Sequence, residues 1–311
     1  MNKMLNLRTW LALATLLWAG VAHGQVAPNS TFFFVKQDNT IYENANLSNG
    51  LGDSLFAGTS GTGGGTKIMR SLIEIDLPGA FAEEIPEGAR IIDVTLVLTV
   101  DTPKLRTGVV NLHRLTRGWG EGTSHANQGE AGGDTPTAND ATWTEAFLNT
   151  TNWTTAGGDF LSAVSASTNV TANGPIVVTS PGLAADLQFW LDNPTENHGW
   201  IIRLEDESLP AIRFGSHDNA DPQLRPFVEV QYAIPLPALI TDFVQTNGLL
   251  QLTVESVEFD LETLIQYNAD LTDTNAWTTI SSVSNLVEGG VILVDPAPLP
   301  NPVNLRLESI R

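Results

Sequence analysis

The chain has 311 residues, of which 42% are hydrophobic, 16% are charged and none is cysteine. This length suggests about two domains, and the absence of cysteine excludes disulfide bonds and thiolate metal sites. The net charge of −20 opposes binding to nucleic acid phosphates and to anionic membranes. An acidic surface suits neutral glycans and calcium, and it also keeps a protein soluble without any further role.

The first residues have the pattern of a secretory signal peptide. Lys3 and Arg8 give a positive start, and an apolar run follows that is shorter than the about 20 residues needed to span a bilayer. The small residues Ala22 and Gly24 stand where a signal peptidase cleaves. We therefore expect a signal peptide over residues 1–24, no membrane anchor and a secreted, extracellular protein.

Short apolar runs separated by Gly, Asn, Asp and Pro dominate residues 25–233. Within one of them, Val94, Leu96 and Leu98 share one parity, as in a strand with one buried face. Strands are predicted at 32–35, 72–75, 91–100, 109–115, 176–178, 200–202 and 227–230. Many short strands between turns indicate an all-β fold, and we expect a jelly-roll β-sandwich.

A single short helix is predicted after residue 180. Ser180 is a good N-cap, Pro181 suits the first helical position, and Asn193-Pro194 ends the apolar periodicity. Three stretches rich in Gly, Ser, Thr and Asn, at 50–65, 118–139 and 150–158, are predicted to be long loops.

The proline-containing stretch 234–237 is a stiff linker to a second unit. Residues 238–311 carry predicted strands at 249–254, 264–267, 277–282, 291–294 and 303–307. Strands of this length indicate a small immunoglobulin- or fibronectin-like β-sandwich, for which we expect a spacer or adapter role.

The sequence carries no recognised catalytic motif. Zinc-protease and nucleophile-elbow motifs are absent, and the glycine run at 61–67 lacks the Gly-Lys-Ser/Thr ending of a phosphate loop. We therefore predict that the protein is not an enzyme. Because carboxylates are abundant, a polysaccharide lyase or glycosidase stays open as an alternative.

Three tryptophans interleaved with acids and glycines are the candidate carbohydrate-binding residues: Trp119, Trp143 and Trp153. An aromatic ring can stack on the apolar face of a sugar while nearby carboxylates take its hydroxyls. The alternative is that these rings fill the core.

Five acids on turn-rich segments are the candidate calcium ligands: Asp38, Glu43, Glu121, Asp140 and Asp159. Ca²⁺ prefers hard oxygen ligands, and because no EF-hand spacing is present, distant loops would have to assemble the site. The alternative for each acid is a turn cap or a solvated charge.

Together these motifs resemble the DNRLRE-domain proteins, which are related to a carbohydrate-binding-module family. The likeness covers roughly residues 38–232. It is carried by Asp38-Asn-Thr-Ile-Tyr-Glu43, Arg70-Ser-Leu-Ile-Glu-Ile-Asp76, Leu112-His-Arg-Leu115, Trp119-Gly-Glu-Gly122, Asp140-Ala-Thr-Trp143, Asn197-His-Gly-Trp200 and Arg213-Phe-Gly-Ser216. Where the family has Ser-Arg-Glu near the last strand, this chain has Ser216-His217-Asp218.

The resemblance implies a β jelly-roll module of secreted bacterial proteins, some of which bind polysaccharides, often with a structural calcium. We therefore expect a secreted carbohydrate-binding module, with a polysaccharide or glycan as partner and Ca²⁺ as the cofactor. A structural or adhesive protein of the cell surface, with extracellular protein partners, is the second hypothesis.

Overall fold

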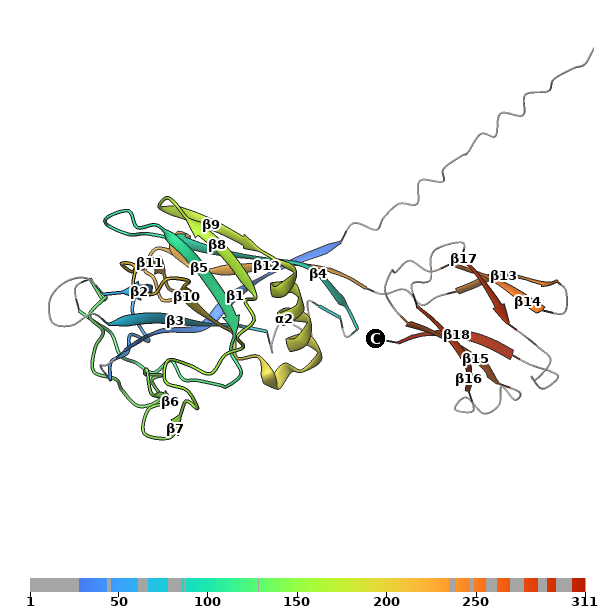
Figure 1. The fold of residues 1–311 in the computed structure, drawn as a ribbon, viewed down its shortest axis with the longest axis horizontal. Helices are drawn as coiled ribbons and strands as arrows, with labels where there is room; N and C mark the ends of the chain where they lie inside the picture. Colours follow the sequence, from blue (N-terminus) through green and yellow to red (C-terminus); the bar gives the residue numbers. More distant parts are fainter. Residues whose placement is uncertain are drawn as a thin grey trace, which may run out of the picture.

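The computed structural model describes residues 28–43, 46–60, 67–77, 85–86, 88–127, 129–234, 239–246, 249–255, 262–268, 277–284, 290–294 and 304–310. Within these ranges the chain is mostly antiparallel strands with one α-helix (Figure 1), which confirms the expected all-β fold. The predicted signal peptide lies outside the described residues, as does the linker after residue 234. In the part of the chain described here, no helix has both the length and the apolar character to cross a membrane.

The large unit is built from twelve strands and α2 (Pro181–Asp192). The strands are β1 (Asn29–Tyr42), β2 (Ser54–Thr59), β3 (Ile68–Ile75), β4 (Arg90–Val100), β5 (Gly108–Arg114), β6 (Glu145–Phe147), β7 (Thr151–Asn152), β8 (Ala166–Val170), β9 (Gly174–Thr179), β10 (Trp200–Leu204), β11 (Ile212–Gly215) and β12 (Phe227–Ala233). Short 3₁₀ turns lie at Pro194–Glu196 and Pro222–Leu224.

Ten of these strands form one continuous sheet in the order β1-β12-β4-β11-β2-β3-β10-β5-β8, with β9 paired to β4. An additional pairing between β1 and β3 closes the path into a ring. The result is a barrel-like sandwich in which β12, β4 and β9 face β3, β10 and β5 across one core (Figure 1).

Strand β1 passes from one layer of the sandwich to the other. Its first half pairs with β12, from Asn29 opposite Tyr232 to Phe34 opposite Phe227. The register then shifts after Val35, and the second half pairs with β3. A bulge bends a strand and increases its twist, so this shift lets one strand serve both layers. It also sets the position of the next residues, among them Asp38.

The core lies between the two layers and confirms the predicted strand parity. Val94, Leu96 and Leu98 of β4 are buried in it. Helix α2 covers one end of the sandwich, where Trp190 packs on Trp200 of β10 with ring centroids 4.7 Å apart. The predicted cap is present, because Ser180 Oγ accepts a hydrogen bond of 3.1 Å from the Leu183 backbone.

Six strands were not predicted, namely β2, β6, β7, β8, β11 and β13, of which β7 lies in the expected loop at 150–158. Residues 54–58 of β2 are all buried, because Leu55 and Ala57 lie in the main core while Phe56 packs with Tyr42 and Met69 on the other face, so the strand shows no alternation of exposed and buried positions. The expected loop at 50–65 is therefore wrong for this segment. The stretch 118–139 has no helix or named strand in its described residues.

The second unit has six strands in two three-stranded antiparallel sheets, β13-β14-β17 and β16-β15-β18. Their bounds are β13 (Leu239–Thr246), β14 (Leu249–Glu255), β15 (Glu262–Asn268), β16 (Thr278–Ser284), β17 (Gly290–Val294) and β18 (Asn304–Ile310). Two small antiparallel sheets match the small β-sandwich expected for residues 238–311.

Candidate functional site

Two of the three candidate tryptophans are buried. Residues after β5 fold over the outer face of β3 and β10 and form a second hydrophobic cluster there. In it Trp119 is 3% and Trp153 is 5% exposed. The indole of Trp119 donates to the His198 carbonyl, and that of Trp153 donates to the Thr142 carbonyl, each over 2.9 Å. Both rings fill core, so neither offers a free face to a sugar, and their assignment as stacking residues is corrected.

Trp143 keeps a partly exposed ring at the edge of this second cluster. The Arg70 guanidinium lies over the ring at 4.7 Å from its centroid and forms two hydrogen bonds with Glu207, of 2.7 and 2.9 Å. Arg203 also bonds Glu207, over 2.8 Å. Trp143 therefore sits beside a charged, ordered surface on the outside of the sheet.

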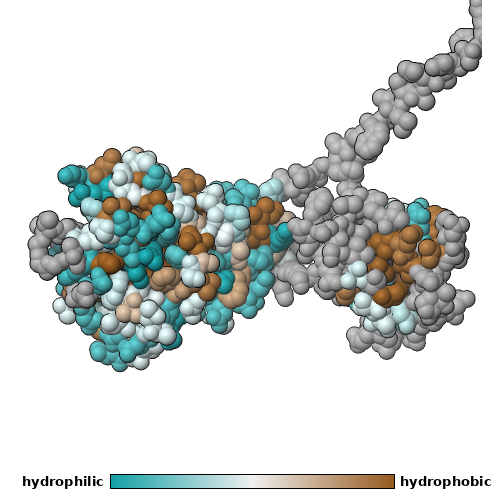
Figure 2. Space-filling model, viewed as in Figure 1, coloured by the Kyte–Doolittle hydropathy of each residue, from teal (hydrophilic) through white to brown (hydrophobic). Residues whose placement is uncertain are grey.

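That outer surface continues across β10, β5 and β8, and Phe160 at the edge of the second cluster lies against Arg203 and His113 on it. Arg203 stands opposite Asn111, which stands opposite Ser167. In the next row of the same face, Val109 stands opposite Asn169. Figure 2 shows hydrophilic side chains over the part of the molecule where β5 and β10 lie. The sheet thus presents polar side chains in register on a continuous strand surface.

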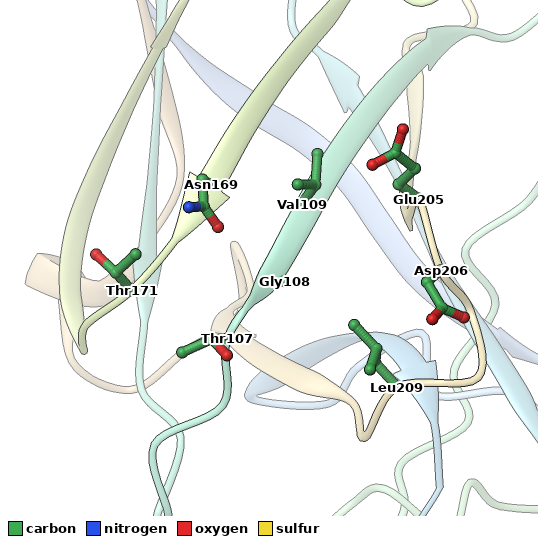
Figure 3. Close-up of a pocket in the computed structure, with 8 residues that line it drawn as sticks. All are labelled: Thr107, Gly108, Val109, Asn169, Thr171, Glu205, Asp206 and Leu209. Carbon is green, nitrogen blue, oxygen red and sulfur yellow. The ribbon is translucent and has the colours of Figure 1, made fainter.

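A cleft of about 510 Å³ lies at the end of this surface. Figure 3 shows its lining, which comes from the start of β5, the end of β8 and the turn after β10: Thr107, Gly108, Val109, Asn169, Thr171, Glu205, Asp206 and Leu209. The volume is in the range of small-molecule sites. The polar lining residues of the cleft are two threonines, an asparagine and two acids, and Val109 and Leu209 are its aliphatic ones. The sequence prediction missed this cleft, because nothing in the sequence shows which loop ends meet.

In two of the five predicted calcium ligands, the carboxylate oxygens accept hydrogen bonds from residues of their own loops. Asp140 accepts hydrogen bonds from the backbone and hydroxyl of Thr137 and from Ser124. Asp159 accepts from the Thr154 and Thr155 backbones, each over 2.9 Å, and from Arg117 over 2.8 Å. Both acids act as loop caps, the alternative that the sequence left open.

Asp38 and Glu121 do come together, and His217 joins them. Asp38 Oδ1 lies 3.4 Å from His217 Nδ1, and Glu121 Oε1 lies 3.5 Å from the same nitrogen. On the far side of the ring, Asp218 Oδ1 lies 3.6 Å from Nε2. We call Asp38, Glu121, His217 and Asp218 the acid–histidine cluster. The fifth predicted acid, Glu43, takes a 3.4 Å hydrogen bond from the Ile68 backbone instead.

Backbone contacts fix each member of this cluster. Asp38 Oδ2 accepts from the His217 backbone over 2.7 Å, and Glu121 Oε1 accepts from the Asp38 backbone over 2.7 Å. The glycines around Glu121 allow its loop to lie close to its neighbours. At Gly122, φ is +71° and a Cβ would lie 1.9 Å from Asp140 Oδ1. The Trp119-Gly-Glu-Gly122 motif therefore serves to hold Glu121 in place.

The cluster perturbs the acidity of its members. Burial raises the pKa of Asp38, and it raises the pKa of Glu121 to about 7 against the effect of its hydrogen bond from Asp38. Burial opposes the charge on His217, but Asp38, Glu121 and Asp218 outweigh it and raise the pKa of the imidazole to about 9. Three buried atoms of the cluster have no hydrogen bond, Asp38 Oδ1, His217 Nδ1 and Asp218 Oδ2, and the first two face each other.

This donor set fits calcium poorly. Ca²⁺ takes six to eight oxygen ligands, and of the five predicted acids only Asp38 and Glu121 share a site, next to an imidazole nitrogen. The resemblance marked the position of His217, where the chain departs from the family pattern. The sequence could not show that it meets Asp38, 179 residues away.

No family model matches the chain, and no curated protein matches it either. The likeness to DNRLRE-domain proteins therefore remains an expectation drawn from the motifs.

Proposed function

We propose that the chain is a secreted, non-catalytic protein that binds polysaccharide, and that the sugar occupies the cleft of β5, β8 and the turn after β10. The observation that carries the proposal is the lining of that cleft. Asn169, two threonines and two acids line an open space of about 510 Å³ together with the aliphatic side chains of Val109 and Leu209. Sugars are bound by hydrogen bonds to their hydroxyls and by apolar contact with their C–H faces.

The polar groups that the proposal needs come from two elements: β8 supplies the amide, and the turn after β10 supplies the two carboxylates. Asn169, Glu205 and Asp206 are exposed. Neither Lys nor Arg is among the eight lining residues. Two carboxylates without a cation repel an acidic sugar and accept hydrogen bonds from the hydroxyls of a neutral one. We therefore expect a neutral polysaccharide.

The polar surface beyond the cleft supports a chain ligand over a single sugar. Asn169 lies next to Val109, and from there the rows lead to Asn111 and Arg203. Trp143 stands beyond Arg70 at the far end. An extended ligand has contacts available along the sheet, and many modest contacts add to the affinity that one cleft provides.

The test is binding of the purified full chain to a panel of neutral and acidic polysaccharides, by calorimetry and affinity electrophoresis. Asn169→Ala and Glu205→Ala should each weaken binding to a neutral polysaccharide by about 10-fold, as expected for a lost hydrogen bond to a polar or charged group. The matched control is Asn152→Ala, an exposed asparagine on β7 away from the cleft, which should bind normally.

Binding to no polysaccharide of the panel would defeat the proposal and favour the structural or adhesive role with protein partners. Equal affinity in wild type, Asn169→Ala and Glu205→Ala would remove the cleft as the site. Release of new reducing ends from a bound polysaccharide, abolished by Glu205→Gln, would replace binding with catalysis.

A further inference from the structure

We infer that Asp38, Glu121 and His217 form a binding site for one divalent transition-metal ion of the zinc type. One ligand atom from each residue lies within 4.8 Å of the other two. The three come from β1, the loop after β5 and the turn after β11, so the ion joins segments far apart in the sequence. This site is separate from the cleft, and it does not depend on the proposed polysaccharide binding.

Two of the three distances between the ligand atoms match tetrahedral coordination, and the third is within 4.8 Å. With bonds of about 2.0–2.1 Å, two ligands of a tetrahedral zinc stand about 3.4 Å apart. The Asp38–His217 and Glu121–His217 distances are 3.4 and 3.5 Å. These contacts are too long for good hydrogen bonds, yet they are of the length that an ion between the atoms requires.

Two buried polar atoms that have no hydrogen bond face each other at the proposed site. Asp38 has a side chain that is 1% exposed, and its Oδ1 lacks a hydrogen bond, as does His217 Nδ1 facing it. Leaving both atoms unsatisfied in a buried position is costly, whereas an ion between them satisfies both. His217 and Glu121 are partly exposed, which gives the ion a route from solvent.

The second nitrogen of the imidazole has a carboxylate near it, at ion-pair distance but beyond hydrogen-bond distance. Asp218 Oδ1 lies 3.6 Å from His217 Nε2. A histidine that binds a metal through one nitrogen commonly directs the other N–H at a carboxylate, which fixes the ring and raises its basicity. Asp218 lies at ion-pair distance from Nε2, so it is a positioning residue that acts on the ring through its charge, and it leaves Nδ1 to the ion.

The nitrogen ligand decides between ion classes. A site with two carboxylates and one imidazole suits Zn²⁺ and its first-row neighbours, and it supplies too few oxygens for Ca²⁺. Three protein ligands leave a fourth position for water.

The experiment titrates the full chain, freed of metal by dialysis against chelator, with ZnCl₂, CoCl₂ and CaCl₂. We expect one Zn²⁺ per chain in calorimetry, the intense visible absorption of four-coordinate Co²⁺, and a higher Tm with Zn²⁺ than with Ca²⁺. His217→Gln should weaken Zn²⁺ binding by about 100-fold or more, and Asp218→Asn by about 10-fold. The control is His125→Gln, an exposed histidine outside the cluster, which should bind Zn²⁺ as wild type does.

If His217→Gln does not fold, the wild-type protein still gives the answer through its ring nitrogens. In ¹⁵N spectra the Nδ1 resonance of His217 should move on adding one equivalent of Zn²⁺, while the other histidines stay unchanged. Absence of stoichiometric Zn²⁺ binding would leave the cluster as a charged imidazole between carboxylates and overturn the inference. Unaltered Zn²⁺ affinity in His217→Gln, or tighter binding of Ca²⁺ to the same residues, would overturn it as well.

Discussion

The glycine after Glu121 should be among the least replaceable residues of the large unit. At Gly122 the backbone is left-handed, with φ at +71°, and a Cβ there would lie 1.9 Å from Asp140 Oδ1. Placing a side chain at such a φ costs about 1–2 kcal/mol. The Asp140 carboxylate must also move by more than about 1 Å, and each of its hydrogen bonds with Thr137 and Ser124 contributes about 1 kcal/mol. Gly122→Ala should therefore lower the free energy of unfolding by about 3–5 kcal/mol.

Gly129 provides the matched control. Its φ is +81°, and a Cβ there would meet no atom within 4 Å. Gly129→Ala should cost only the backbone term of about 1–2 kcal/mol. Urea unfolding of both variants, followed by tryptophan fluorescence, gives the difference, which is the cost of displacing Asp140. An equal loss in the two variants would show that Asp140 does not lie against Gly122, and the reasoning for this loop would be refuted.

Three further changes test other parts of the fold. Asp159→Asn should cost about 1–2 kcal/mol at pH 7, because the carboxylate accepts hydrogen bonds from Thr154, Thr155 and Arg117. Partial burial opposes this charge, but those bonds outweigh it and lower the pKa of Asp159. Its contribution is therefore full above the unfolded pKa of about 3.9 and is lost as the pH falls through the lower folded value, so the urea midpoints of wild type and variant should converge as the pH falls below about 3.9. Trp153→Ala should lose about 3–5 kcal/mol in urea unfolding, since the ring is buried; a variant of normal stability that fails only to bind polysaccharide would contradict this. Ser180→Ala should cost about 1 kcal/mol through loss of the helix cap, and a thermal melt that matches wild type would argue against the bond to Leu183.

The strands with clear alternation could be predicted from the sequence, as could α2. Strand β4 shows a two-residue period because it has one buried face, and α2 has a cap, a first-turn proline and a stop. Strand β2 lacks such a signal, because neighbouring parts of the sandwich bury both of its faces. The two-residue pattern arises because one face of a strand is apolar and the other is polar. Where both faces are buried, both are apolar, and the pattern disappears.

The candidate site was harder to predict because burial there depends on long-range folding. Trp119 and Trp153 are buried only because the residues after β5 fold back over β3 and β10. A glycine-rich sequence around an aromatic residue is equally typical of an exposed loop. Of the five predicted acids, Asp38 and Glu121 share a cluster, but they do so with His217, which no local spacing connects to them. The abundance of carboxylates pointed to a site built from acids, but the sequence does not show which residues each carboxylate contacts.

The double use of β1 has a consequence for the order in which the molecule can assemble. The first strand of the large unit pairs with the last one, from Asn29 opposite Tyr232 onward, and it also pairs with β3. A growing chain therefore keeps the first half of β1 as an unpaired edge until β12 has been synthesised. Contacts between such distant residues form slowly, and an open edge can pair with another chain in the meantime. Removal of β1 would leave β12 and β3 each with an unpaired edge. The closed ring of strands would then become an open sheet with two edges that can pair with another chain.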